Sequence, residues 1–183
     1  MTFKEINKAL ASKIKIDELV EVFRSEIDEL SSLGNVVMLS QELLTFQNIT
    51  DFCVDGYRIV RLKDITDIST CDKNDTLSFM NMIYKKERLF PETQTFIDAK
   101  SWNAVFKSLS LSMTPVTVEC AFDDAIDYYF GWIKTVDDNV AVLQCFDGSG
   151  QIFKDEVKVN LNFVTQLMFG NKYIELMAKY AQN

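Results

Sequence analysis

The sequence contains no histidine among its 183 residues, so it lacks the side chain that most often acts as a general base or a metal ligand. Its four cysteines, Cys53, Cys71, Cys120 and Cys145, form no C-x-x-C pair, and this spacing favours neither a zinc site nor a redox dithiol. We interpret them as buried, reduced thiols. The sequence therefore predicts no metal, no cofactor and no catalytic residue.

Long apolar runs and an excess of basic residues are also missing. No window approaches the roughly 18 uncharged apolar residues of a membrane-spanning helix, and residues 1–8 have no apolar core of signal-peptide length. We therefore expect a cytoplasmic protein without a membrane partner. The chain has 19 Lys and Arg against 27 Asp and Glu, a net charge of −8. Because binding to a phosphate backbone depends on clustered Lys and Arg, no nucleic-acid partner is expected.

What the chain does contain is a strand-turn-strand pattern that occurs twice, over residues 34–47 and 131–144. Each copy opens with a glycine, runs through an apolar segment, breaks at a polar tip and resumes with residues that favour strands. The tips are residues 40–42 and 137–139. This pattern is typical of a β-hairpin.

Similar elements flank both predicted hairpins. Alternating β-branched residues predict a preceding strand near residues 19–25 and its counterpart near 116–122. After the hairpins come two turn signals, Asp55-Gly56 and Asp147-Gly148-Ser149-Gly150. Helical spacing of apolar residues predicts four helices, over residues 2–10, 77–87, 101–109 and 173–180, with Ser101 as the N-cap of the third.

These elements predict an α+β protein, mainly β, with two tandem five-stranded barrels of the SH3-like or Sm-like kind that arose by internal duplication. The first domain is expected over residues 1–87, with an N-terminal helix, a barrel and a trailing helix. A packed helical linker follows over residues 88–114. The second barrel and the C-terminal helix complete the chain over residues 115–183.

The segment from Gly131 to Asp137 resembles the first motif of the Sm family, in which a glycine opens the second strand and an aspartate closes it six positions later. The resemblance implies a small barrel. It does not imply RNA binding, because Ala141 stands where the family has its RNA-contacting asparagine. The Arg-Gly of the second Sm motif is also missing from Val60-Arg61-Leu62 and from Val159-Asn160-Leu161.

The candidate binding residues are an aromatic pair and the aspartates just before it: Asp123, Asp124, Asp127, Tyr128 and Tyr129. One interpretation is that alternate rings enter the core. The other is that Tyr128 and a neighbouring ring point outward and, rimmed by carboxylates, anchor a basic protein partner.

The sequence thus favours a non-catalytic binding or scaffolding module for a protein partner, including a basic toxin or nuclease that an acidic protein would neutralise. One alternative is a small-molecule or metal-dependent enzyme that uses a cleft between the barrels. A third hypothesis is an Sm-like RNA binder, and homo-oligomerisation is left open.

Overall fold

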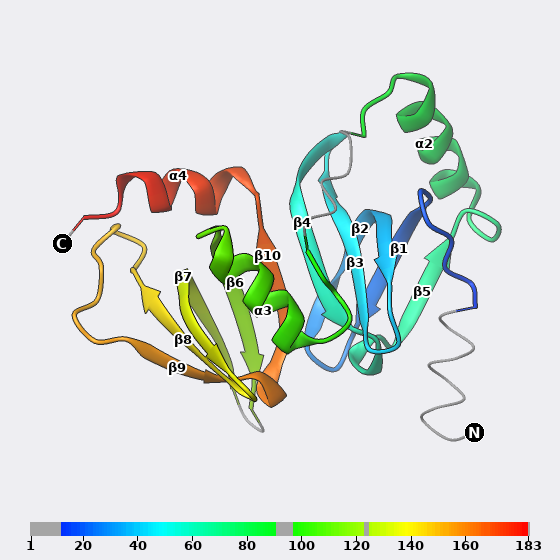
Figure 1. Cartoon of the computed structure of the whole chain (residues 1–183). Helices are drawn as coiled ribbons and strands as arrows, with labels where there is room; N and C mark the ends of the chain where they lie inside the picture. The colour runs from blue at the N-terminus through cyan, green and yellow to red at the C-terminus, as the bar shows by residue number, and fades with distance from the viewer. Residues whose placement is uncertain (1–11, 91–96, 123–124, 183) are drawn as a thin grey trace. The chain divides into compact units, whose positions relative to one another are not determined.

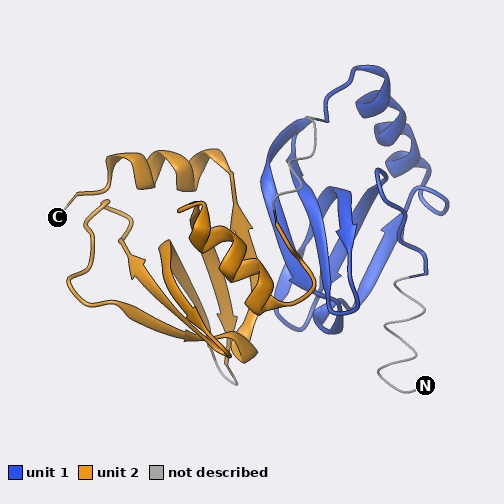
Figure 2. Ribbon diagram, in the orientation of Figure 1, with its two compact units in different colours: residues 1–94 blue, residues 95–183 orange. Residues whose placement is uncertain are grey.

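A computed structural model of the chain describes residues 12–90, 97–122 and 125–182 (Figure 1). The chain divides into two compact units, residues 1–94 and 95–183 (Figure 2). The helix expected over residues 2–10 lies outside the described residues. In each unit the strands pair with antiparallel neighbours. From the first strand onward both units have the same order of elements: four strands, a short 3-10 helix, a last strand and an α-helix.

In unit 1 the strands lie in the order β5-β1-β2-β3-β4. The last helix packs against β1. The elements are β1 (Leu19–Arg24), β2 (Asp28–Leu39), β3 (Leu43–Thr50), β4 (Cys53–Arg61), η1 (Leu62–Asp64), β5 (Asp67–Thr70) and α2 (Asp75–Lys86).

In unit 2 the equivalent order is β10-β6-β7-β8-β9, and a further helix precedes the first strand. That helix packs against β7. The elements are α3 (Trp102–Leu111), β6 (Pro115–Ala121), β7 (Ile126–Asp137), β8 (Val140–Cys145), β9 (Val157–Asn160), η2 (Leu161–Phe163), β10 (Val164–Phe169) and α4 (Lys172–Tyr180).

The prediction of two closed SH3-like or Sm-like barrels is wrong. The protein is α+β, but its antiparallel sheet is open. Among the described residues no pairing joins β5 to β4, and none joins β10 to β9. The four residues of β5 all pair with β1, and the four residues of β9 all pair with β8. Both strands pair on one side only and stand at the two ends of the strand order, so the sheet closes no ring.

Most of the predicted local elements are confirmed. Both hairpins form, as β2–β3 and β7–β8, and the strands near residues 19–25 and 116–122 are β1 and β6. The helices expected over 77–87, 101–109 and 173–180 are α2, α3 and α4. The Ser101 hydroxyl accepts a hydrogen bond from the Ala104 amide at 3.3 Å, as an N-cap side chain should.

One predicted turn is misplaced. Asp55 and Gly56 lie within β4, where Gly56 has φ +70° at an irregularity in the pairing with β3. The turn between the two strands is formed by Asp51 and Phe52, with φ +47° and +62°. Both values fall in the left-handed region that bulky residues rarely adopt, so a search for Asp-Gly pairs could not find this turn.

The glycines that open the hairpins stand where two strands approach closely. A Cβ atom at Gly34 would lie 2.6 Å from the Gln47 carbonyl oxygen and would collide with the Phe46 ring. A Cβ atom at Gly131 would lie 2.8 Å from the Cys145 Cα and would collide with the Gln144 carbonyl oxygen. Each glycine therefore lets the long second strand of its unit press against the third.

The core of each unit lies against this bent sheet. In unit 1 it contains the fully buried Val36, Leu44 and Phe46 of the hairpin. In unit 2, α3 buries one face made of Trp102, Val105, Phe106 and Leu109. The end of α3 and the outer side of α4 remain at the surface, and there they form part of the site described below.

We predict that Gly131→Ala lowers the free energy of unfolding by about 1 to 3 kcal/mol, because the added methyl group meets backbone atoms of β8 that cannot move aside. Gly148→Ala is the matched control, since nothing lies within 4 Å of a Cβ atom at that position. Chemical denaturation followed by circular dichroism measures both. Equal stability of the two variants would contradict the role assigned to Gly131.

Candidate functional site

The structure brings only some of the five predicted binding residues together. Asp123 and Asp124 lie outside the described residues. Asp127, Tyr128 and Tyr129 are consecutive in β7, so their side chains alternate between the two faces of the sheet. The Tyr129 hydroxyl donates to Asp127 Oδ2 at 3.2 Å, and the Tyr128 hydroxyl donates to Glu119 Oε2 at 3.2 Å. Asp127 and Tyr129 therefore lie on one face of the sheet, and Tyr128 lies on the other.

The environment of Tyr129 favours its neutral form. Burial raises the pKa of Tyr129 to about 12, with further contributions from the negative charge of Asp127 and from the hydrogen bond to it. Tyr129 is only partly exposed, whereas Tyr128 has 49% of its surface accessible. Tyr128 is thus the one of the two rings that a partner can reach over a large area.

Four exposed apolar residues lie on or against the end of the β6–β7 hairpin, and we call them the hairpin tip: Phe122, Ile126, Tyr128 and Phe163. The rings of Phe122 and Phe163 lie 5.0 Å apart, and these two residues remain 41% and 43% exposed. Phe163 comes from η2, far along the chain, so the sequence pattern around the aspartates could not include it.

Hydrogen bonds to the buried carboxylate of Glu119 hold Tyr128 in place. Glu119 lies on β6, directly opposite Tyr128 of β7 and Gln166 of β10. Its carboxylate is buried and accepts hydrogen bonds from Thr165 Oγ1 at 2.5 Å and Gln166 Nε2 at 3.3 Å, besides that from Tyr128. Thr165 reaches it because the pairing of β10 with β6 is irregular there. This carboxylate was not anticipated from the sequence, since nothing in the alternation of β6 distinguishes it.

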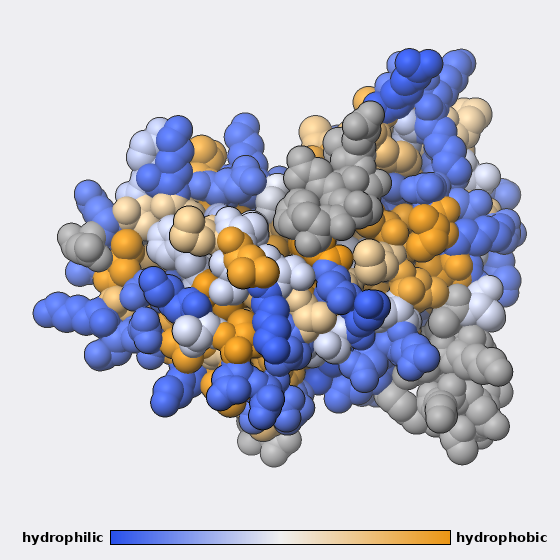
Figure 3. Space-filling view, viewed as in Figure 1, coloured by the Kyte–Doolittle hydropathy of each residue, from blue (hydrophilic) through white to orange (hydrophobic). Residues whose placement is uncertain are grey.

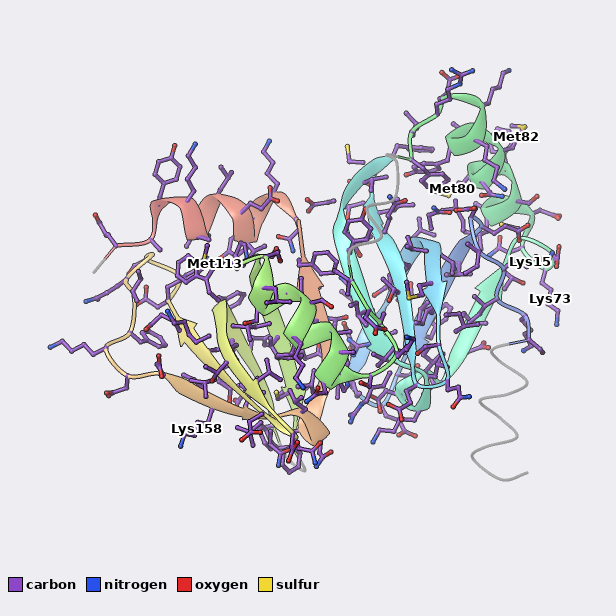
Figure 4. The ribbon with its side chains drawn as sticks, in the orientation of Figure 1. Lys15, Lys73, Met80, Met82, Met113 and Lys158 are labelled. Carbon is purple, nitrogen blue, oxygen red and sulfur yellow. The ribbon has the colours of Figure 1, made fainter. Side chains whose placement is uncertain are left out.

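A second feature of unit 2 is a cleft of about 510 Å³ between the end of α3 and strands β7 and β8, which we call the α3–β7 groove. It is lined by Ser110, Met113, Trp132, Ile133, Lys134 and Gln144. Met113 follows α3 and lies beneath α4 in Figure 4. Figure 3 shows apolar side chains at the surface on this side of unit 2.

Aromatic rings extend the groove towards α4. Phe130 and Trp132 point to the same face of β7, and the Phe130 ring meets that of Tyr173 edge-on at 6.3 Å. Tyr173, Leu176 and Tyr180 then form an exposed stripe along α4, because positions three and seven residues apart share a helix face. The contact between Phe130 and Tyr173 thus joins α4 to the face of β7 that also carries Trp132 of the cleft.

Other chemistry has little support among the residues that the structure describes. They include no group of three or more Cys, Asp or Glu side chains arranged to hold a metal ion. Their helices are too short or too polar to cross a membrane. Cys120 and Cys145 are buried as expected, but Cys71 is only half-buried and Cys53 is exposed, contrary to the prediction. Cys53 is exposed because it directly follows the Asp51-Phe52 turn. Burial raises the pKa of Cys145 to about 11, which makes it a poor nucleophile.

No protein-family model, curated protein or solved structure matches this chain. Ala141, at the position that aligns with the Sm-family asparagine, is fully buried. A side chain there would face the core rather than a ligand. The functional argument therefore rests on the geometry of unit 2.

We predict that Tyr129 ionises near pH 12, about two pH units above an ordinary tyrosine. Because the folded protein favours the neutral phenol, the stability contributed by Tyr129 is complete below about pH 10 and is lost as the pH rises from about 10 to about 12. Ultraviolet titration of tyrosinate measures this step. It should disappear in Tyr129→Phe and move to lower pH in Asp127→Asn, and an unchanged titration in Tyr129→Phe would contradict the assignment.

We also predict that Thr165→Val lowers the free energy of unfolding by about 1 to 3 kcal/mol, since it removes a hydrogen-bond donor from a buried carboxylate and keeps the branched shape. Thr135→Val on the exposed part of β7 is the control and should change stability little. Thermal unfolding of the two variants gives the comparison. A Thr165 variant as stable as the control would show that the hydrogen bond contributes nothing.

Proposed function

We propose that the protein is a non-catalytic binding module that docks a basic protein partner on the hairpin tip. The observation that carries this proposal is the exposed ring pair of Phe122 and Phe163, with Tyr128 also exposed on β7 of the same hairpin. Aromatic rings at a surface are the usual anchors of protein interfaces, because each buries a large area at a low cost in side-chain entropy.

Charge supports a partner of basic character. In the sequence, residues 119–129 include four acidic residues and no basic one, and the whole chain carries a net charge of −8. A negative field of this kind speeds the approach of a positively charged protein and disfavours an acidic one. Neutralisation of a basic toxin or nuclease is a specific form of this function.

The non-catalytic role and a cytoplasmic location are part of the proposal. The described residues hold no metal-ligating cluster, and the chain has no histidine to act as a base for a thiol nucleophile. The four cysteines form no disulfide, which fits a reducing compartment, where thiols stay reduced.

Affinity capture from the native cell, followed by titration of the purified captured protein, tests the proposal. We expect a captured protein of high isoelectric point. Its affinity should fall at least about tenfold with Tyr128→Ser or Phe122→Ser, because each removes an aromatic anchor. Binding should also weaken as salt is raised, since salt screens exposed charges.

Phe79→Ser is the matched control, because Phe79 is an exposed ring on α2 of unit 1 and should not affect this binding. Circular dichroism of each variant checks that the fold is intact. If the tip variants bind the captured protein as tightly as Phe79→Ser does, the hairpin tip is not the docking surface.

A further inference from the structure

The α3–β7 groove has the size and the lining of a small-molecule site. Its volume of about 510 Å³ falls within the roughly 300 to 1,000 Å³ that is usual for pockets that bind small ligands. Sites of this kind combine an apolar wall with a few polar groups that orient the ligand. The groove has three apolar and three polar lining residues: Met113, Trp132, Ile133, Ser110, Lys134 and Gln144.

An irregularity in β7 brings consecutive residues to the groove. Side chains of a regular strand alternate between its two faces, yet Trp132, Ile133 and Lys134 all line the groove. The pairing of β7 with β8 shifts between Ile133 and Thr135, and a bulge of this kind commonly re-aims a side chain beside a binding site. The charge of Lys134 therefore lies at the same opening as the Trp132 ring.

Met113 occupies a position that costs stability. It follows the end of α3 with φ +49°, in the left-handed region that favours glycine after a helix. Its large apolar side chain is 77% exposed. Neither feature benefits the fold, so the methionine is better explained by a contact with a molecule outside the chain. A flexible thioether suits such a contact, because it adapts to the shape of a ligand and packs well against aromatic rings.

The Trp132 ring offers a flat surface that is held in place. It packs against the buried ring of Phe146, with ring centroids 5.3 Å apart. Gln144 lies directly opposite Trp132 on β8, and its Nε2 donates to the Phe153 carbonyl at 2.6 Å, which leaves Oε1 of this amide as an acceptor. A rigid aromatic wall favours a planar ring that stacks on it, since little side-chain entropy is lost on binding.

Charge selects the class of ligand. Lys134 is the only charged residue of the lining and is exposed. Within residues 12–90, 97–122 and 125–182 no ion pair joins Lys134 to a carboxylate. A cationic ligand would meet repulsion at this opening, whereas an anionic one would gain an opposite charge.

We propose that the α3–β7 groove binds a small planar aromatic anion, of the class of aromatic carboxylates, stacked on Trp132 with its charged group at Lys134. Met113 covers the outer side of the bound ring, and Gln144 Oε1 accepts a hydrogen bond from a donor on the edge of the ligand. This site lies apart from the hairpin residues to which the protein partner was assigned, so it does not rest on the proposed function.

Titration of the full chain with 2-naphthoate, followed by nuclear magnetic resonance, tests the proposal. The indole N–H signal of Trp132, told from that of Trp102 by its loss in Trp132→Phe, should shift and saturate with a Kd of about 1 mM or lower. The matched probe is 2-naphthamide, which has the same ring without the charge. It should bind at least about threefold more weakly, because it makes no ion pair with Lys134.

Two variants divide the charge from the apolar contact. Lys134→Gln should abolish the preference for 2-naphthoate and leave the affinity for 2-naphthamide unchanged. Lys158→Gln is the control, since this lysine is on β9 and well apart from Met113 in Figure 4. Met113→Gly should weaken the binding of both probes at least about threefold and yet raise the unfolding temperature, because glycine relieves the left-handed backbone. A methionine with a merely structural role would not give these opposite effects.

Three results would each overturn the proposal. They are a Trp132 signal that does not move with 2-naphthoate up to about 10 mM, equal affinity of the wild-type chain for the two probes, and binding by Met113→Gly as tight as by the wild type. The first two need no variant that alters the groove. None of the three depends on the capture of a basic protein, so the groove and the hairpin tip stand or fail separately.

Discussion

The close approach of neighbouring strands at Gly34 and Gly131 is the constraint on which the rest of the structure depends. In unit 2 it divides β7 in two: residues 126–132 pair with β6, and residues 131–137 pair with β8. The first part carries Ile126 and Tyr128 to the hairpin tip, and the residue after the glycine, Trp132, lies in the groove. One bent strand therefore supplies both candidate surfaces, and any side chain at Gly131 would disturb their spacing.

The two surfaces differ in how their side chains are held. Tyr128 is fixed by its bond to Glu119, a buried carboxylate that also accepts from Thr165 and Gln166. A buried carboxylate with several donors is costly to leave incomplete, so it holds the ring in one position. The groove depends instead on packing: Trp132 rests on Phe146, with ring centroids 5.3 Å apart, and Gln144 Nε2 donates to the Phe153 carbonyl at 2.6 Å.

Local periodicity was enough to predict the hairpins, the strands that precede them and the three described helices, because these depend on residues close in sequence. Closure of a barrel depends instead on whether short last strands such as β5 can pair on both sides, which no local pattern encodes. The same limit applies to the site. Tyr128 could be proposed from its neighbours, but Phe163, Glu119 and the groove residues are brought together only by the register of distant strands.

The positions of the two tryptophans have a practical consequence. Trp102 and Trp132 are the only tryptophans in the chain, and both lie in unit 2. Trp102, the first residue of α3, is 7% exposed, while Trp132 lines the groove. Tryptophan fluorescence therefore reports on unit 2 alone, with one tryptophan in the core and one at the surface. Unfolding of unit 1 can be resolved as any loss of circular dichroism that occurs without a change in tryptophan emission.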